Sequence, residues 1–477
     1  MNTDDLWPDL IEAEPRVLRM QAKLHQWATD GPDRRFCDLY NLVSDPAFLV
    51  VAWHRVRGNR GARSAGVDGV QPSSILFGHA LLAGVREDLK ARRFQPLPVK
   101  ERMIPKANGK RRRLGIPTAR DRVVQASLKL VLEPIFEADF KPVSYGFRPK
   151  RRAQDAVAEI HYLASRSYEW VLEGDITACF DEISHVGLMD RVRGRIGDKD
   201  VLALVKAFLK SGILTEDGET KGTKTGTPQG GILSPLLANV ALSVLDEHFV
   251  GAWETTMATS LDRQRRLRRK EANYRLVRYA DDFVVLVAGT KAHAEDLRDE
   301  VAAVLAPMGL RLSEEKTTVV HIDEGFDFLG FRIQRQRKRG SDKRFVYTWP
   351  SKKALASIMA KVRSITRQGT NNSFADLVRQ LNAALRGWTT YFRYGVSKAT
   401  FGYLGDYVWH RVYHWIRQKH RHTTWKSLRR RHLLPGAWFG QEQAALFDCA
   451  AVTVTRYRYR GTAIPTPWDE QIAIMAG

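Results

Sequence analysis

Cysteine is scarce in this chain, and this and other missing features exclude several classes of protein. The 477 residues include three cysteines, Cys37, Cys179 and Cys449, which lie far apart in the sequence. They supply no C-x-x-C metal pair and no disulfide framework, which fits a reducing compartment. No apolar run reaches the length of a transmembrane helix, and the first residues, M-N-T-D-D-L-W, lack the apolar region of a signal peptide. We therefore expect a cytoplasmic protein with no membrane partner.

Acidic residues are outnumbered by basic ones. The chain carries 76 Lys and Arg residues against 53 Asp and Glu residues, a net charge of +23. Such an excess indicates a polyanionic partner, and the 12 Trp, 14 Tyr and 20 Phe residues could stack on exposed bases. A basic surface without a specific partner is the alternative. With 44% hydrophobic residues, the chain can fold into roughly two to four domains with a sizeable core.

The segment Leu276–Leu286 reads L-V-R-Y-A-D-D-F-V-V-L. Two runs of β-branched and aromatic residues flank a polar turn that carries Asp281 and Asp282, which predicts a β-hairpin with two carboxylates at its tip. A carboxylate pair on a rigid turn suits Mg²⁺, which prefers hard oxygen ligands and keeps positions open for phosphates. A solvated hairpin turn without a metal is the alternative for this segment taken alone.

Two upstream segments extend this candidate site. The run W-V-L-E-G-D-I at Trp170–Ile176 predicts a strand that ends in Asp175. The run G-T-P-Q-G-G-I-L-S-P-L-L-A-N-V at Gly226–Val240 predicts a glycine loop whose backbone can approach a ligand closely, followed by a helix with Ser234 as N-cap.

A second hairpin is predicted around the Asn108-Gly109 turn, and it is rich in positive charge. A hairpin of this kind can bind phosphates. Two strands that carry carboxylates can hold two metal ions about 4 Å apart, which activate a hydroxyl and stabilise a leaving pyrophosphate. The reaction class that follows is nucleotidyl transfer. The basic residues of this hairpin are Lys106, Lys110, Arg111, Arg112 and Arg113.

The combination and order of motifs closely resemble those of group II intron reverse transcriptases, the intron-encoded maturases. The resemblance covers roughly residue 36 to the end. The motifs that carry it are I-P-K…G-K-R-R-R-L-G-I-P-T…D-R, S-Y-G-F-R-P, D-I-T-A-C-F-D-E-I, G-T-P-Q-G-G-I-L-S-P-L-L-A-N, Y-A-D-D and, near the carboxyl end, L-R-G-W-T-T-Y-F-R.

The resemblance implies an α+β fold, a right-hand polymerase with fingers, palm and an α-helical thumb, the thumb being the maturase domain. We expect five regions. They are a basic, RNA-binding, helical N-terminal extension (1–65), fingers (66–165), a palm with the catalytic aspartates (166–345), the thumb/maturase domain (350–445) and a basic tail without an H-N-H nuclease domain (446–477).

The resemblance also implies roles for individual residues. Asp175 and Asp281 would bind two Mg²⁺ ions, for which Mn²⁺ could substitute, with Asp282 beside them. Lys316 would protonate the leaving pyrophosphate. Phe180 would lie under the sugar of the incoming dNTP and exclude a 2′-OH. Three further residues, Lys106, Arg112 and Gln229, would hold the triphosphate and border the nucleotide pocket.

The expected partners are group II intron RNA in a ribonucleoprotein, an RNA template with a DNA primer, target DNA and dNTPs, in a bacterial cytoplasm and at the nucleoid. Arginines at both ends of the chain are candidates for RNA contact through phosphates. Those near the amino end are Arg55 and Arg57. In the thumb, a helix capped by Ser373, with Asp376 completing a capping box, carries Arg379, Arg386 and Arg393 off its apolar stripe.

One position departs from the family pattern, and two other functions stay open. Arg113 stands where related sequences usually have proline, which changes the stiffness of the basic hairpin and could add a contact. The alternatives to an intron polymerase are a maturase that only assists splicing and a domesticated reverse transcriptase in defence or repair. The sequence leaves the oligomeric state open.

Overall fold

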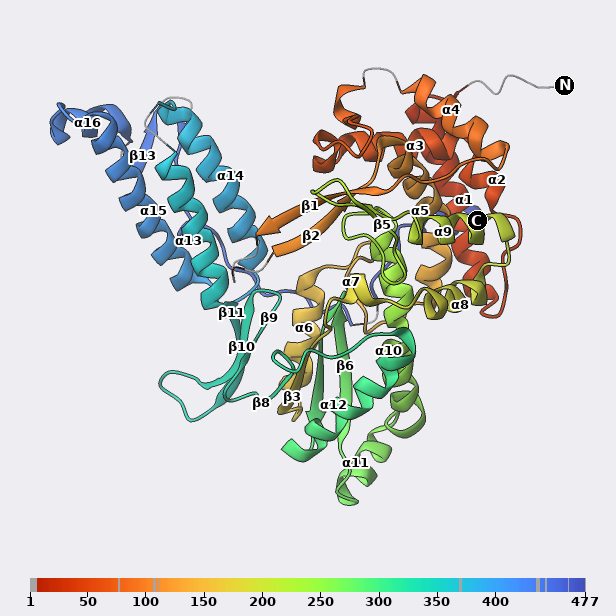
Figure 1. Ribbon diagram of the computed structural model, residues 1–477. Coiled ribbons are helices and arrows are strands. Elements are labelled where there is room, and N and C mark those ends of the chain that lie inside the picture. Colours follow the sequence, from red (N-terminus) through yellow and green to blue (C-terminus); the bar gives the residue numbers. More distant parts are fainter. Residues whose placement is uncertain are drawn as a thin grey trace. The chain divides into compact units, whose positions relative to one another are not determined.

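A computed structural model describes residues 7–75, 78–105, 109, 111–368, 371–434, 438–441, 444–461 and 463–476 (Figure 1). The chain is mixed α/β and divides into two units. Unit 1 contains Met1–Arg152, Leu172–Val319 and Thr462–Gly477, and unit 2 contains Ala153–Val171 and Val320–Gly461. Within the described ranges no helix is both long and apolar enough to cross a membrane.

Unit 1 is built around helix α5 (Ala119–Asp139), which is buried along most of its length. The hydroxyl of Thr118 caps it by accepting a hydrogen bond from the Asp121 N–H. Buried apolar side chains of α5 pack against helices α1 (Leu10–Asp30) and α3 (Pro46–Gly58). The apolar residues of this segment therefore form a core.

The remaining helices of unit 1 surround this core and the two sheets of the unit. They are α2 (Tyr40–Val43), α4 (His79–Lys90), α7 (Cys179–Glu182), α8 (His185–Arg195), α9 (Lys199–Leu209), α10 (Ser234–Thr256), α11 (Ser260–Arg268), α12 (Lys291–Leu305) and α17 (Asp469–Ala476), with 3-10 turns at Arg60–Arg63, Pro72–Ser74 and Ala306–Met308.

The first sheet has the order β2-β1-β4-β5 and the second has the order β6-β7-β3-β8. Helices α10 and α12 pack against β6 and β7 of the second sheet (Figure 1). The strands are β1 (Val99–Pro105), β2 (Arg111–Ile116), β3 (Trp170–Asp175), β4 (Ile213–Leu214), β5 (Thr220–Lys221), β6 (Asn273–Tyr279), β7 (Asp282–Ala288) and β8 (Thr318–His321).

Strands β6 and β7 form the predicted hairpin, which we call the aspartate hairpin. They are antiparallel, and Tyr279 pairs with Asp282, so Ala280 and Asp281 form a two-residue turn. Ala280 has a left-handed backbone (φ 59°), as such tight turns require. Residues 283–287 are almost fully buried, which explains why this strand is continuously apolar.

Unit 2 combines helices with two small sheets of its own. Helix α13 packs against α14 and α15, and Figure 1 shows these three running side by side. The sheets have the orders β11-β10-β9 and β12-β13-β14. The elements are α6 (Ala153–Ala164), β9 (Phe326–Phe328), β10 (Phe331–Arg337), β11 (Arg344–Pro350), α13 (Lys352–Arg367), α14 (Phe374–Phe392), α15 (Lys398–Lys419), α16 (Trp425–His432), β12 (Leu433–Leu434), β13 (Trp438–Gln441) and β14 (Ala444–Ala445).

One predicted helix cap differs from the structure. Ser234 is the first residue of α10 and not its N-cap, and its hydroxyl donates to the Pro228 carbonyl (2.8 Å) inside the glycine loop. Ser373 caps α14 as predicted, because its hydroxyl accepts a hydrogen bond from the Asp376 N–H (3.0 Å). The Asp376 carboxylate reaches back to Ser373 in turn, where hydrogen bonds from the side chain and the backbone of Ser373 lower its pKa.

Candidate active site

The carboxylates of Asp175 and Asp281 come from neighbouring strands of one sheet. Asp175 ends β3, and Asp281 lies in the turn before β7, which is adjacent to β3. A β-carbon at Gly174 would lie 2.0 Å from the Phe283 ring, so glycine is required for β3 and β7 to pack at this point. Sequence and packing therefore place one carboxylate of each strand at the same edge.

Two positive side chains and a third carboxylate lie near this pair of aspartates. Burial raises the pKa of Asp281, and the negative charge of Asp175 raises it further, whereas the positive charges of Arg112 and Lys316 lower it. The ammonium group of Lys316 forms an ion pair and a hydrogen bond with Asp175, which raises the pKa of Lys316. Asp282 is exposed, and its charge also raises the pKa of Lys316. The structure thus brings these five predicted site residues together.

A buried ion pair behind the turn positions Asp281, and the sequence analysis missed it. The guanidinium of Arg278 is fully buried and donates to both carboxylate oxygens of Asp246, at 2.7 and 2.5 Å. It also donates to the carbonyl of Ala280 (2.9 Å), to Asn239 Oδ1 and to Ser144 Oγ. Ala280, the residue before Asp281, is therefore held directly. The available signal was an arginine between Val277 and Tyr279, directly before the turn.

The basic hairpin predicted around Asn108-Gly109 is formed by β1 and β2, which are antiparallel. The Nε–H of Arg112 on β2 donates to Gln229 Oε1 (2.7 Å), and the Gln229 amide donates to Asp181 Oδ2 (3.2 Å). This chain connects the basic hairpin, the glycine loop and helix α7. Arg112 and Gln229 therefore lie together as predicted. Lys106 lies outside the described residues.

The glycine loop packs against protein backbone. Gly230 has a φ of 115°, and a β-carbon there would lie 2.7 Å from the Gly115 carbonyl oxygen. The Gly115 N–H donates to the Gln229 carbonyl (2.7 Å), and the Thr227 N–H donates to the Phe180 carbonyl (2.6 Å). The approach of this loop to a ligand stays a prediction, and the structure shows a second reason for the glycine. It allows the loop to dock on β2.

Arg113, the departure from the family pattern, faces two carboxylates. Its guanidinium lies 3.8 Å from Asp181 Oδ1 and 4.0 Å from Glu101 Oε1. The added contact considered from sequence is present. It links β1, β2 and α7 at the rim of the site, where a proline would leave both carboxylates without this partner.

Phe180 lies on α7, five residues after Asp175, and is buried. The ring of Phe147 stands edge-on to it, with ring centroids 6.2 Å apart. Phe147 has a left-handed backbone (φ 58°) and is 47% exposed. An exposed aromatic residue held in this conformation beside Phe180 is a second candidate for nucleotide contact that the sequence analysis did not single out.

The arginines predicted to bind RNA occupy surfaces of the two separate units. In unit 1, Arg55 and Arg57 are exposed on α3. In unit 2, Arg379 is exposed and pairs with Asp376 (2.9 Å), and Arg386 is exposed with its guanidinium over the Phe447 ring (4.8 Å). Arg393 is only partly exposed, and its buried Nε has no hydrogen-bond partner among the described residues.

Paired carboxylates, a charged lysine and an arginine–glutamine pair suit transfer of a nucleotidyl group. A family described as "Reverse transcriptase (RNA-dependent DNA polymerase)" matches residues 104–333, which include all of these side chains. A second, "Group II intron, maturase-specific domain", matches residues 355–433. The class of protein is therefore an RNA-directed DNA polymerase.

Individual relatives agree. The chain is 37% identical over 373 residues to protein YkfC of Escherichia coli K12, covering 73% of this chain and 97% of YkfC. It is 30% identical over 373 residues to the group II intron-encoded protein LtrA of Lactococcus lactis, covering 69% of this chain and 61% of LtrA. The chain thus spans about three fifths of the length of LtrA. This protein belongs to the group II intron reverse transcriptase/maturase family, whose polymerase domains generally use divalent metal ions.

Proposed function

We propose that this protein copies group II intron RNA into DNA during retrohoming and binds the same RNA to assist its splicing. The observation that carries the proposal is the joint presence of an intact polymerase site and a maturase-specific domain in one chain. The substrates are an RNA template with a DNA primer, dNTPs and target DNA, and the work takes place in the cytoplasm at the nucleoid. Unit 1 provides all site residues that we assign to polymerisation.

The donor set fits two Mg²⁺ ions, with Mn²⁺ as a substitute. The described residues contain no group of three or more His, Cys, Asp or Glu side chains arranged around a metal. Mg²⁺ does not need one, because it typically binds through one or two protein carboxylates, waters and substrate phosphates. Burial raises the pKa of Asp281 and the negative charge of Asp175 raises it further, and a bound cation would offset both effects. We assign both carboxylates as ligands, with Asp282 beside them. When bound, the ions lower the pKa of the primer 3′-hydroxyl and stabilise the leaving pyrophosphate.

The remaining residues bind and orient the dNTP. Arg112 presents its guanidinium to the triphosphate, and Gln229 fixes that guanidinium through the 2.7 Å hydrogen bond. Lys106 remains our third candidate for binding the triphosphate. Lys316 has a raised pKa and is therefore protonated at neutral pH, so it can donate a proton to pyrophosphate.

Replacing Phe180 with alanine should admit ribonucleotides. The Phe180 ring is buried beside Phe147, and the Phe180 backbone carbonyl accepts a hydrogen bond from the Thr227 N–H of the glycine loop. We assign this ring a position beneath the sugar of the dNTP, where its removal opens space for a 2′-OH. We expect the dNTP/rNTP ratio of kcat/KM to fall about 10- to 200-fold, the range for steric discrimination of about 1–3 kcal/mol. Single-nucleotide extension measures it, and Phe147→Ala tests whether the neighbouring ring shares the role. An unchanged ratio in Phe180→Ala removes Phe180 from sugar selection.

Splicing tests the RNA part of the proposal. RNA transcribed from the DNA around the coding sequence should splice faster with the protein, and Asp281→Asn should retain this stimulation while losing cDNA synthesis. A maturase that only assists splicing would make no cDNA as wild type. A domesticated polymerase would make cDNA and stimulate no splicing.

Replacing Arg379, Arg386 and Arg393 together with glutamine should weaken splicing stimulation more than extension of a short primer. The reason is that phosphate contacts to a large structured RNA are lost while the polymerase site in unit 1 is untouched. Affinity for the intron RNA should also become less dependent on salt, because fewer counterions are released. Splicing rates, extension rates and titrations at several salt concentrations measure this.

The structure gives a specific control for this variant. Arg379 pairs with Asp376 and Arg386 stacks on Phe447, so both also have partners within the protein. Arg367→Gln and Lys361→Gln on α13 remove charge from a neighbouring helix of the same unit. If the triple variant melts many degrees below this control, or loses splicing and extension equally, the arginines are structural.

A further inference from the structure

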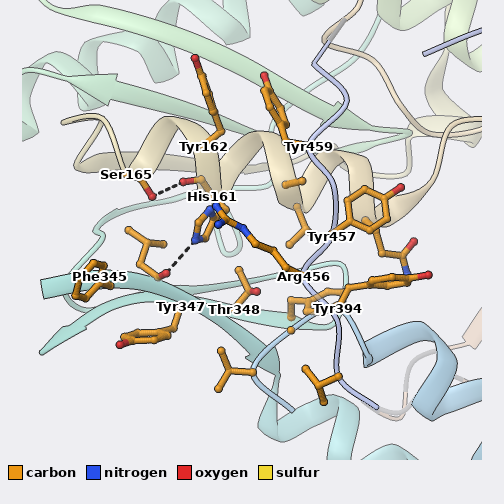
Figure 2. A pocket seen from close by; sticks show the side chains of 18 of the residues that line it. His161, Tyr162, Ser165, Phe345, Tyr347, Thr348, Tyr394, Arg456, Tyr457 and Tyr459 are labelled. Atoms are coloured by element: carbon orange, nitrogen blue, oxygen red, sulfur yellow. Dashed lines mark hydrogen bonds between the residues drawn. The ribbon is translucent and has the colours of Figure 1, made fainter. Parts of the chain in front are cut away.

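A large cavity lies within unit 2, and the proposed polymerase chemistry does not use it. Its volume is about 1080 Å³. Four segments line it, which are α6, the hairpin of β10 and β11, the turn 394–398 and the extended segment 454–459 (Figure 2). We call it the tyrosine–arginine cavity.

Positive charge lines this cavity without compensation. Its lining contains no Asp or Glu residue, and none of its lysines and arginines forms an ion pair with a described residue. Burial lowers the pKa of His161, and the charge of Arg456 lowers it further, so the imidazole is neutral and donates to the Val346 carbonyl (3.0 Å). The charge therefore resides on five long side chains, Arg166, Lys338, Lys398, Arg456 and Arg458.

Aromatic rings accompany these charges. Figure 2 shows Tyr162 of α6 beside Tyr459 of the segment 454–459, and their rings are stacked with centroids 4.5 Å apart. The guanidinium of Arg166 lies 3.6 Å from the Tyr162 ring centroid. Phe345, on the opposite wall, is 45% exposed. Rings and cations therefore alternate around an open space.

The wall formed by residues 454–459 is held in place from behind. Arg460 forms an ion pair with the buried carboxylate of Asp155 (2.6 Å), to which the Tyr457 hydroxyl also donates (2.9 Å). The Tyr459 hydroxyl donates to Glu159. These anchors engage Tyr457, Tyr459 and Arg460, whereas Arg456 and Arg458 are exposed and line the cavity. The site is preformed, which lowers the entropic cost of binding.

We propose that the tyrosine–arginine cavity binds a single-stranded segment of nucleic acid, with phosphates on the arginines and lysines and bases on the exposed rings. A groove that combines positive charge with stacking surfaces is what non-sequence-specific strand binding requires. An acidic peptide would pair with the positive charges but would leave the aromatic rings without a stacking partner. A single small anion would fill only a small part of a cavity of this volume. None of the described residues assigned to polymerisation lines the cavity, so this proposal does not depend on the proposed function.

The test titrates protein into a labelled ten-nucleotide oligo(U) strand and measures binding by fluorescence anisotropy. An unlabelled hairpin primer–template is present in excess to occupy the polymerase site. Arg456→Gln with Arg458→Gln should weaken binding at least about fivefold and reduce the slope of log K against log salt by about 1.4, roughly 0.7 for each lost phosphate contact. Phe345→Ala should weaken it at least about fivefold through lost stacking. A blunt duplex should bind these variants and wild type alike.

Lys291→Gln with Arg298→Gln on α12 is the matched control. It removes the same net charge from side chains that already contact carboxylates, and it should leave strand binding unchanged. Lys338→Gln is a further cavity variant with little risk to folding, because this residue is exposed in the turn after β10. It should weaken binding in the same direction as the arginine pair.

Three outcomes decide the matter. The proposal is overturned if every cavity variant binds the strand with an affinity within about twofold of that of the control. Each lost contact should weaken binding by more than about twofold. The proposal is also overturned if the charge variants lose strand affinity, Phe345→Ala does not, and inorganic polyphosphate competes as well as an unlabelled strand. That result would assign the cavity to a polyanion without bases. Loss in both classes supports it. Failure of wild type to make cDNA would refute the polymerase proposal alone.

Discussion

Asp281→Asn should reduce RNA-templated DNA synthesis by about a thousandfold or more. The substitution keeps the shape of the side chain and removes one of the two negative charges that meet at the ends of β3 and β7. Loss of a metal-ligand charge at such a site removes several kcal/mol of transition-state stabilisation, and roughly 4 kcal/mol corresponds to about a thousandfold in rate. Primer extension under single-turnover conditions measures the effect.

The control is Asp299→Asn, which removes the same charge from an exposed position on α12. It should extend primers at the wild-type rate. Asp281→Asn should remain folded, because the neutral side chain no longer suffers the burial and repulsion that raise the pKa of the carboxyl. A variant that retains even a tenth of wild-type activity would show that Asp281 is not a metal ligand.

Arg278→Met should cause the largest loss of stability of any single change considered for this protein. It leaves the carboxylate of Asp246 buried without its bidentate partner, and breaking such a pair typically costs about 3–5 kcal/mol. Calorimetric or denaturant unfolding measures this loss.

The double variant Arg278→Met with Asp246→Leu separates stability from positioning. Replacing both charges with apolar groups should restore most of the stability, as is often found for buried pairs. The Ala280 carbonyl still lacks its donor, so the catalytic turn can shift, and a displacement of about 1 Å can cost about 100-fold in kcat. Recovery of full kcat in the folded double variant would mean that Arg278 has no positioning role.

Arg195→Met provides the comparison. Arg195 is also a buried arginine with a carboxylate partner, Asp139 (2.9 Å), but its other polar contacts are to backbone carbonyls at the end of α1, including those of Ala28 and Gly31. Its loss should lower the melting temperature and leave the kcat of the folded fraction unchanged.

The sequence predicted the local elements of the site because each depends on a short-range pattern. The two runs of β-branched and aromatic residues around Asp281 define a hairpin, and the apolar run before Asp175 defines a strand. The basic hairpin followed from the Asn108-Gly109 turn between two Ile-Pro segments. Each of these elements is present in the structure.

The contacts that join these elements could not be predicted in the same way. Arg278 meets Asp246 across 32 residues and Ser144 across 134, and no local pattern marks these partners. Ser234 resembles an N-cap in sequence, yet its hydroxyl is used inside the glycine loop. Gly230 serves the docking of that loop on β2, which depends on the position of a hairpin more than one hundred residues earlier.

The most direct test of the central claim is primer extension by the purified wild-type protein on an RNA template annealed to a DNA primer. With Mg²⁺ and dNTPs we expect full-length cDNA, which chelation of the metal abolishes and added Mn²⁺ restores. Absence of cDNA from folded, RNA-binding protein under these conditions would contradict the assignment of Asp175 and Asp281 to a working polymerase site.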